Sequence, residues 1–177
     1  SLIESPIIGK LQHGEGLGAG CDPEEGRRLA VEKVDEIKKR LSDGTKMLFI
    51  TAGMGGGTGT GAAPVIAKIS KEMGLLTIAV VTQPFRDEGT EFLRRAYEGI
   101  QELSKNVDSL LIIDNQKIYD IYGDLDIWDA FPKADAVLQT AIKGIAEIIT
   151  GHGYINLDFA DVRRVMKDSG MAIMGSG

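Results

Sequence analysis

The chain has 177 residues, 43% of them hydrophobic, and a formal net charge of −6 at pH 7. That length and apolar content suit one globular unit with a sizeable buried core, and the acidic balance argues against a protein that coats a nucleic-acid backbone. A single cysteine, Cys21, excludes an internal disulfide and a thiolate metal cluster, which fits a reducing cytosol. No apolar run approaches the roughly 18 residues of a membrane span, so we expect no membrane insertion.

The first half of the chain predicts a βαβ unit. Asp22-Pro23 is typical of a helix start, and apolar residues at helical spacing predict one helix that continues to residue 41. An apolar strand over 47–51 leads through a glycine-rich loop into a helix over 62–73, and a second strand follows over 75–82. Because strands that are apolar on both faces and joined through a helix usually pair in parallel, we expect an α/β fold, a parallel sheet with helices on both faces.

The same pattern repeats in the second half. We expect a helix over 93–103, a third strand over 109–113 and a short helix over 117–122. From 128 to 150 the apolar positions recur at about 3.6 residues, which predicts a helix long enough to cross a whole domain. A last helix is expected over 159–167.

The loop between the first strand and its helix carries the strongest functional signal. Five of the seven residues from Gly55 to Gly61 are glycine, so few Cβ atoms prevent backbone N–H groups from closing on an anion. The two threonines add hydroxyl donors, and the positive end of the following helix dipole would face the same anion. We therefore predict a phosphate site formed by Gly55, Gly56, Gly57, Thr58, Gly59, Thr60 and Gly61.

Two well-known phosphate loops fit this segment less well. A Walker A loop closes with Gly-Lys-Ser/Thr, whereas this loop closes with Gly61-Ala62-Ala63. The dinucleotide fingerprint requires an acid at the end of the next strand, and no acid occurs here before Asp87. A glycine-rich turn that binds nothing is the structural alternative.

The segment 53–64, Gly-Met-Gly-Gly-Gly-Thr-Gly-Thr-Gly-Ala-Ala-Pro, resembles the GGGTGTG signature of the tubulin/FtsZ family of GTPases, in the form carried by its FtsZ branch. The resemblance covers most of the chain, through residues 16–20, 80–85, 103–108 and 156–162. It implies a Rossmann-like GTPase domain from the bacterial cell-division machinery.

The resemblance also implies a domain organisation. Residues 1–170 would form a partial GTPase domain, with a central helix at about 128–150 and a loop at about 154–161. Residues 171–177 would be the first residues of a second, C-terminal domain. The family's first strand and a GxGGxGxN loop for the α- and β-phosphates should precede Ser1, so we expect a fragment with weak nucleotide affinity by itself.

The resemblance implies that the site holds GTP or GDP, with Mg²⁺ accompanying GTP, and it assigns no metal-ligating residue to this chain. The phosphates would fall to the glycine segment. The loop Gly18-Ala19-Gly20 would lie near the γ-phosphate and sense its presence, with an ordinary turn before the Asp22 helix start as the structural alternative.

Other residues match positions on the nucleoside side of the family's site. Pro84 and Glu88 match a ribose-side loop, although Glu88 alone is typical of a solvated acid in a first helical turn. Asn115 matches a polar guanine-side residue just after a strand end, where open parallel sheets bind their ligands. Phe131 matches an aromatic that packs on the base, although an aromatic on an apolar helix face is more often core.

The segment Asn156-Leu157-Asp158-Phe159-Ala160-Asp161 matches the family's N-x-D-x-x-D synergy loop. From spacing alone, Asp158 and Asp161 suit a helix start equally well, one as the N-cap and the other as a first-turn acid. The resemblance implies that Asn156, Asp158 and Asp161 act on the nucleotide of the next subunit, polarising the attacking water. Catalysis would then require head-to-tail assembly, a contact that yields filaments.

These implications together describe a cytoplasmic GTPase that polymerises at the division septum. Its partners would be other copies of itself and, through a C-terminal tail, division proteins. We expect no nucleic-acid partner and no direct membrane insertion.

Two positions depart from the family pattern. Phe92 aligns with an arginine that serves the nucleotide, and Arg94 or Arg95, one turn on, are the candidates to replace it. Ala136 aligns with the guanine-reading aspartate, while Asp135 lies one position earlier and so points about 100° away on a helix. The sequence therefore supports phosphate binding more firmly than guanine selectivity. The alternative function is a divergent protein of the family that binds nucleotide or polymerises without turnover.

Overall fold

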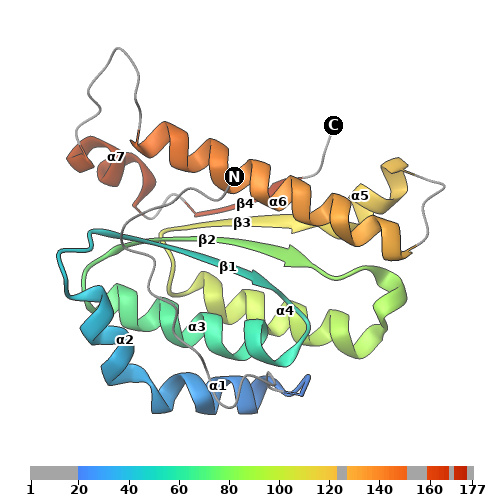
Figure 1. The fold of residues 1–177 in the computed structure, drawn as a ribbon, viewed down its shortest axis with the longest axis horizontal. Helices are drawn as coiled ribbons and strands as arrows, with labels where there is room; N and C mark the ends of the chain where they lie inside the picture. The colour runs from blue at the N-terminus through green and yellow to red at the C-terminus, as the bar shows by residue number, and fades with distance from the viewer. Residues whose placement is uncertain (1–19, 123–126, 151–158, 168–169, 175–177) are drawn as a thin grey trace.

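A computed structural model describes residues 20–122, 127–150, 159–167 and 170–174. Figure 1 shows the elements in chain order, coloured from blue to red. They are α1 (Pro23–Glu32), α2 (Val34–Leu41), β1 (Met47–Gly53), α3 (Gly57–Glu72), β2 (Leu76–Gln83), the short 3₁₀ helix η1 (Arg86–Glu88), α4 (Thr90–Ser104), β3 (Ser109–Asp114), α5 (Asn115–Tyr122), α6 (Ile127–Thr150), α7 (Phe159–Met166) and β4 (Gly170–Met174).

The strands form one parallel sheet in the order β1-β2-β3-β4. The register pairs Gly53 with Thr82 and Gln83 with Asp114, so the first three strands end at a common carboxyl edge. The first six residues of β2, from Leu76 to Val81, are all buried, as the unbroken apolar run predicted. The predicted α/β class is confirmed.

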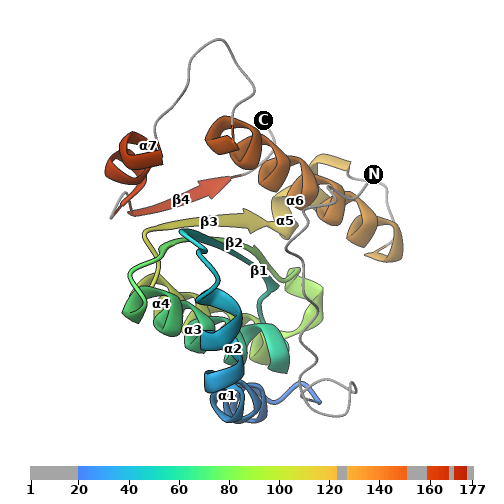
Figure 2. The ribbon, with the colours of Figure 1, turned by 60° about the vertical axis from the view of Figure 1, so that its left-hand side comes forward.

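Helices cover both faces of this sheet (Figures 1 and 2). One core lies between the sheet and α3 with α4, and it comprises Ile50, Met54, Ala63, Ala67, Ala79, Val81, Ala96, Ile100, Leu103, Leu110 and Ile112. The other lies between the opposite face and α5 with α6, and it comprises Val80, Phe85, Ile113, Ile118, Ala134 and Ala141. Helices α1 and α2 form an outer layer beyond α3. Of the described helices, none is long and apolar enough to cross a membrane.

Two helices differ from the sequence prediction. The single helix expected from Asp22 to residue 41 is broken at Lys33, whose N–H bonds to the Ala30 carbonyl 3.2 Å away in a tightened turn. Helix α3 begins at Gly57, well before the expected Ala62. Glycine is a poor helix former, but the first turn of a helix makes few internal hydrogen bonds, and here packing against α1 fixes its conformation.

Residues 170–174 form β4, which pairs in parallel with β3, Ser109 opposite Gly170. The sequence led us to expect the first residues of a second domain from residue 171, and in the structure residues 170–174 add a strand to the same sheet. The division of the wider protein into a domain over 1–170 and another from 171 stays a prediction. Much of the predicted synergy loop, residues 154–158, lies outside the described residues.

Candidate functional site

Three predicted site segments meet at the carboxyl edge of the sheet. The glycine segment follows β1, the Pro84–Glu88 loop follows β2, and Asn115 follows β3 directly. Because the strands are parallel and in register, their carboxyl ends place these segments side by side (Figure 1). Open parallel sheets bind ligands at this edge, so the topology supports a site here.

The glycine segment is a sharp turn followed by the first turn of α3. Gly55 has a φ of +111°, which favours glycine, and its N–H donates to the Thr60 hydroxyl oxygen 2.8 Å away. Thr60 is buried and closes the loop from inside, whereas Thr58 is exposed. Gly56 is the N-cap of α3, and no side chain in the described part of the chain caps this helix start. The first N–H groups of α3 therefore remain suited to an anion.

The glycines of this segment fall into two groups. A Cβ atom placed on Gly56 would meet no atom of the described residues within 4 Å, so this part of the chain leaves the position open. A Cβ on Gly59 would lie 2.3 Å from the Gly53 carbonyl oxygen, and one on Gly61 would lie 1.9 Å from that of Pro23. Gly59 and Gly61 are thus required for backbone packing whether or not a ligand binds.

Helix α1 packs directly on the start of α3. A Cβ on Gly26 would lie 2.4 Å from the carbonyl oxygen of Gly57, so the two helices touch backbone to backbone. Sequence reasoning missed Gly26, although a glycine inside a predicted helix is itself a signal of a close approach. Helix α1 therefore packs directly against the glycine segment.

The loop after β2 is held in shape by one of its own predicted site residues. Glu88 accepts a hydrogen bond from the Phe85 N–H at 2.8 Å, which secures η1. Pro84 is buried and lies against Gly55, since a Cβ on that glycine would be 3.3 Å from the proline Cγ. The Arg86 N–H donates to the Gln116 side chain at 3.0 Å, and this bond ties the loop to α5.

Asn115 carries a buried polar atom that no described residue hydrogen-bonds. Its side chain is 6% exposed, and its Oδ1 has no hydrogen-bond partner within the described part of the chain. An unsatisfied buried acceptor costs about 1–3 kcal/mol, so such an atom is usually paired with a ligand donor or a bound water. The base or sugar of a nucleoside offers N–H and O–H groups of the kind this oxygen lacks.

The arginines of α4 take separate paths. Phe92, which the resemblance aligns with an arginine of the family, packs on Gly55. Arg94 is exposed and pairs with Glu91 and Glu98 on its own helix. Hydrogen bonds from Arg94 and then Arg95 lower the pKa of Glu91 to about 2.

The Arg95 side chain extends from α4 to the turn before α1. Its Nη1 donates to the Cys21 carbonyl oxygen at 2.5 Å. Gly20 and Cys21 have φ values of +55° and +63°, so two successive residues are left-handed. Of the predicted loop Gly18-Ala19-Gly20, only Gly20 lies within the described residues.

The remaining predicted residues lie on α6 and α7. Phe131 belongs to α6, but its side chain is outside what the structure describes, and Asp135 and Ala136 are exposed on that helix. Asp161 is exposed in the first turn of α7, whereas Asn156 and Asp158 lie outside the described residues. The roles predicted for these residues therefore stay predictions.

Helix α7 lies at the opposite end of the sheet from the glycine segment (Figure 1). Ser109, the first residue of β3, donates to the carbonyl oxygen of Met166, the last residue of α7, at 3.1 Å. The amino ends of the strands thus meet α7, and the carboxyl ends meet the glycine segment. Asp161, in the first turn of α7, therefore lies at the other end of the sheet from the glycine segment of its own chain.

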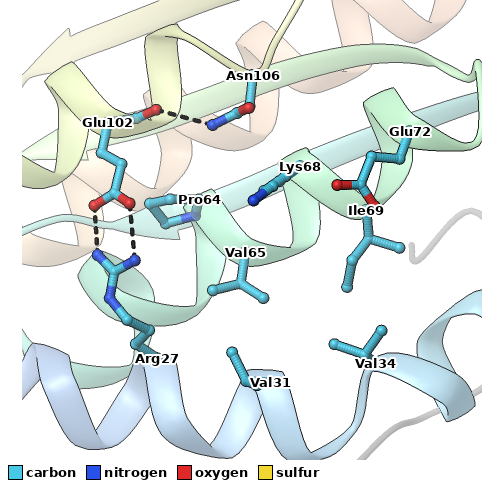
Figure 3. A pocket seen from close by; sticks show the side chains of 10 residues that line it. All are labelled: Arg27, Val31, Val34, Pro64, Val65, Lys68, Ile69, Glu72, Glu102 and Asn106. Atoms are coloured by element: carbon cyan, nitrogen blue, oxygen red, sulfur yellow. Dashed lines mark hydrogen bonds and ion pairs between the residues drawn. The ribbon is translucent and has the colours of Figure 1, made fainter.

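A cavity of about 290 Å³ lies apart from the predicted site, between α3 and the outer helices (Figure 3). It is lined by Arg27, Val31, Val34, Pro64, Val65, Lys68, Ile69, Glu72, Glu102 and Asn106. At one end Arg27 donates two hydrogen bonds to Glu102, at 2.8 and 2.5 Å, and joins α1 to α4. These bonds lower the pKa of Glu102 and raise that of Arg27.

Comparison with known proteins agrees with this architecture. The family model described as "Tubulin/FtsZ family, GTPase domain" matches residues 4–123. The cell division protein FtsZ of Pseudomonas putida is 56% identical over 164 residues, which are 92% of this chain and 41% of that protein. FtsZ of Wigglesworthia glossinidia brevipalpis is also 56% identical over 164 residues, covering 92% of this chain and 42% of its own length.

A solved structure is similarly close. The empty FtsZ dimer of M. jannaschii superposes with a TM-score of 0.84 at 49% identity, covering 88% of this chain and 45% of that one. The chain thus spans less than half the length of these relatives. With its GGGTGTG segment at the carboxyl edge of a parallel sheet, the chain belongs to the tubulin/FtsZ family of GTPase domains.

Proposed function

We propose that the protein binds GTP at the carboxyl edge of the sheet and, in its complete form, hydrolyses it in head-to-tail filaments at the cytoplasmic division septum. The observation that carries the binding proposal is the unsatisfied Oδ1 of Asn115, buried at the same edge as the uncapped start of α3. The Asn115 oxygen can accept a hydrogen bond, and the start of α3 can bind an anion. A nucleotide supplies both.

In this proposal the phosphates lie over Gly56 and accept hydrogen bonds from the first N–H groups of α3. The helix dipole adds roughly 0.3–1 kcal/mol at an exposed terminus. Thr60 keeps the turn closed from inside and leaves Thr58 as the exposed hydroxyl. The described residues contain no cluster of three or more metal-ligating side chains, so Mg²⁺ would arrive with the nucleotide, held by phosphates and water.

On the nucleoside side, Asn115 would accept a hydrogen bond from the base. Pro84 and Glu88 would shape the ribose side, as the fixed η1 loop allows. Phe131 and Asp135 of α6 are proposed base contacts on the strength of the family match alone. Gly18, Ala19 and Gly20 are proposed for the terminal phosphate in the same way.

Hydrolysis is proposed to occur between subunits. Asp161 stands on α7 at one end of the sheet and the phosphate segment stands at the other, so stacking copies end to end would bring them together. Asn156 and Asp158 would join Asp161 there and polarise the attacking water. The contacts with other division proteins, through a C-terminal tail, belong to the same proposal.

The proposal is tested by calorimetric GTP titration and phosphate-release assays on the complete protein and its Asn115→Ala variant. We expect about a three- to tenfold loss of GTP affinity, the equivalent of one hydrogen bond. Lys117→Ala, an exposed position on the same helix, is the matched control. Absence of GTP binding by the unmodified protein, or an Asn115→Ala variant that binds like the control, would contradict the assignment.

A second candidate is a protein that binds nucleotide or polymerises without turnover. The specific observation in its favour is that Phe92 packs on Gly55 while Arg94 is committed to Glu91 and Glu98. The same assays separate the two candidates. GTP binding without phosphate release in the complete, assembled protein would select this one.

A further inference from the structure

Arg95 is the one charged side chain that the structure shows crossing from α4 to the turn before α1. Its guanidinium donates from Nη1 to the Cys21 carbonyl oxygen at 2.5 Å and from Nε to Glu91 at 3.0 Å. Glu91 lies one helical turn before Arg95 and holds the guanidinium in place. The acceptor is main chain, so the contact fixes backbone and does not depend on the side chain at position 21.

That backbone is held in an unusual conformation. Gly20 and Cys21 are both left-handed, and for a residue with a Cβ, such as Cys21, this conformation is disfavoured. Directly after the turn, the Asp22 side chain accepts the Glu24 N–H at 3.0 Å and starts α1. The charge-assisted bond to the Cys21 carbonyl therefore stabilises a backbone conformation that is disfavoured by itself.

The other side of the same turn rests on α3. Pro23, two residues after Cys21, touches Gly61 so closely that a Cβ there would lie 1.9 Å from its carbonyl oxygen. Two elements thus fix this turn: the first turn of α3 packs on its backbone, and α4 hydrogen-bonds to it through Arg95. The first turn of α3 is also the proposed phosphate site.

We propose that Arg95 is a positioning residue that holds the Gly20–Cys21 turn beside the phosphate end of the site. This inference rests on the proposed function, in which the loop ending at Gly20 adjoins the terminal phosphate. Arg95 does not touch the nucleotide. It sets the place of the backbone that does, and its loss weakens the contact that distinguishes GTP from GDP.

The test measures GTP and GDP affinity of the complete protein and of Arg95→Met, which keeps the apolar stem and removes every donor. We expect GTP affinity to fall about five- to tenfold while GDP affinity stays within about twofold, because one charge-assisted bond is lost on the terminal-phosphate side. Arg95→Lys, which can still donate to the carbonyl, should restore the GTP-to-GDP ratio to within about threefold of the unmodified protein.

Arg94→Met is the matched control, since it removes a neighbouring arginine that pairs with Glu91 and Glu98 and does not reach the turn in the described structure. Thermal melting of each variant checks that it is folded. An unchanged ratio in Arg95→Met, an equal loss in Arg94→Met, or a lysine variant as defective as methionine would overturn the inference. If the unmodified protein binds neither nucleotide, the proposed function fails and this inference fails with it.

Discussion

Single glycines in the signature segment serve different purposes. Gly59 and Gly61 leave room for neighbouring carbonyl groups, and Gly55 needs its positive φ. At Gly56 no described residue would lie within 4 Å of an added Cβ, and the backbone, with φ −77° and ψ −177°, is one that any residue can adopt. This distinction separates what the fold requires from what a ligand would require.

Gly56→Ala should therefore fold normally and bind nucleotide poorly. The free energy of unfolding should change by less than about 1 kcal/mol, since the lost chain flexibility and the poorer N-cap roughly offset each other. Affinity for GTP should fall about tenfold or more, because the methyl group stands where the phosphates would lie. Urea unfolding and GTP titration measure the two effects.

Gly144→Ala is the control for this substitution, since its Cβ also meets nothing within 4 Å, but on α6. It should leave GTP affinity unchanged and raise stability by about 0.5–1 kcal/mol through helix propensity. Normal GTP binding by Gly56→Ala would show that the phosphates do not lie over this position.

Helix α1 is joined to α3 by backbone contact and to α4 by an ion pair. Gly26→Ala should destabilise the fold by about 2–3 kcal/mol, because its Cβ would lie 2.4 Å from a carbonyl oxygen that α3 cannot readily move. Urea midpoints of this variant and of Gly144→Ala provide the comparison. A Gly26→Ala midpoint equal to that of the unmodified chain would show that α1 can shift freely on α3.

The ion pair between Arg27 and Glu102 should make the stability of this layer depend on pH. Hydrogen bonds from Arg27 lower the pKa of Glu102 below its ordinary value in the folded state. Its stabilisation is therefore fully present above the unfolded pKa and is lost as the pH falls through the lowered, folded pKa. Since both side chains are more than a third exposed, the pair contributes about 0.5–1 kcal/mol.

The measurement compares urea midpoints of the unmodified chain and Glu102→Gln at pH 7 and then in steps downward from about pH 5. The unmodified chain should be the more stable at pH 7, and the difference should shrink with acid. Glu98→Gln, exposed on the same helix and paired only within it in the described structure, is the matched control. A difference that stays constant into acid would show that Glu102 acts through packing.

At this scale the sequence predicted the elements well and their junctions poorly. Periodicity located β1, β2, β3 and α6 because burial on two faces or one stripe leaves a direct trace in residue order. The early start of α3 and the break at Lys33 depend on contacts between α1 and α3, distant in sequence, which no local pattern reports. Likewise, the motifs pointed to Gly55 to Gly61 and Asn115, whose roles stay predictions, but not to the Arg95 contact, because its acceptor is main chain.

Across the whole molecule, the two halves of the proposed reaction stand at opposite ends of the sheet. A mixing experiment on the complete protein tests this separation. Gly56→Ala should lack a competent phosphate site, and Asp161→Ala should lack the acid, so each alone should release phosphate slowly. Mixed in equal amounts, they should release it several-fold faster than the sum of the two, because some contacts join an intact site to an intact Asp161.

Asp161→Ala alone, at twice its concentration in the mixture, gives the baseline rate. Lys167→Ala, at an exposed position just after α7, is the matched control for Asp161→Ala. If the mixture releases phosphate only as fast as the sum of the two variants measured alone, then the reaction occurs within one chain or uses other residues.

Strand β1 lies at one edge of the sheet, and among the described strands only β2 pairs with it. The N–H and C=O groups on its outer side are left available by those strands, and a further strand, from this protein or from another molecule, can pair there. Such addition would widen the sheet sideways and would not depend on GTP, whereas the proposed head-to-tail contact needs nucleotide between subunits. Association that does not depend on GTP would therefore indicate strand pairing at this edge of the described sheet, and it should not be mistaken for the start of a filament.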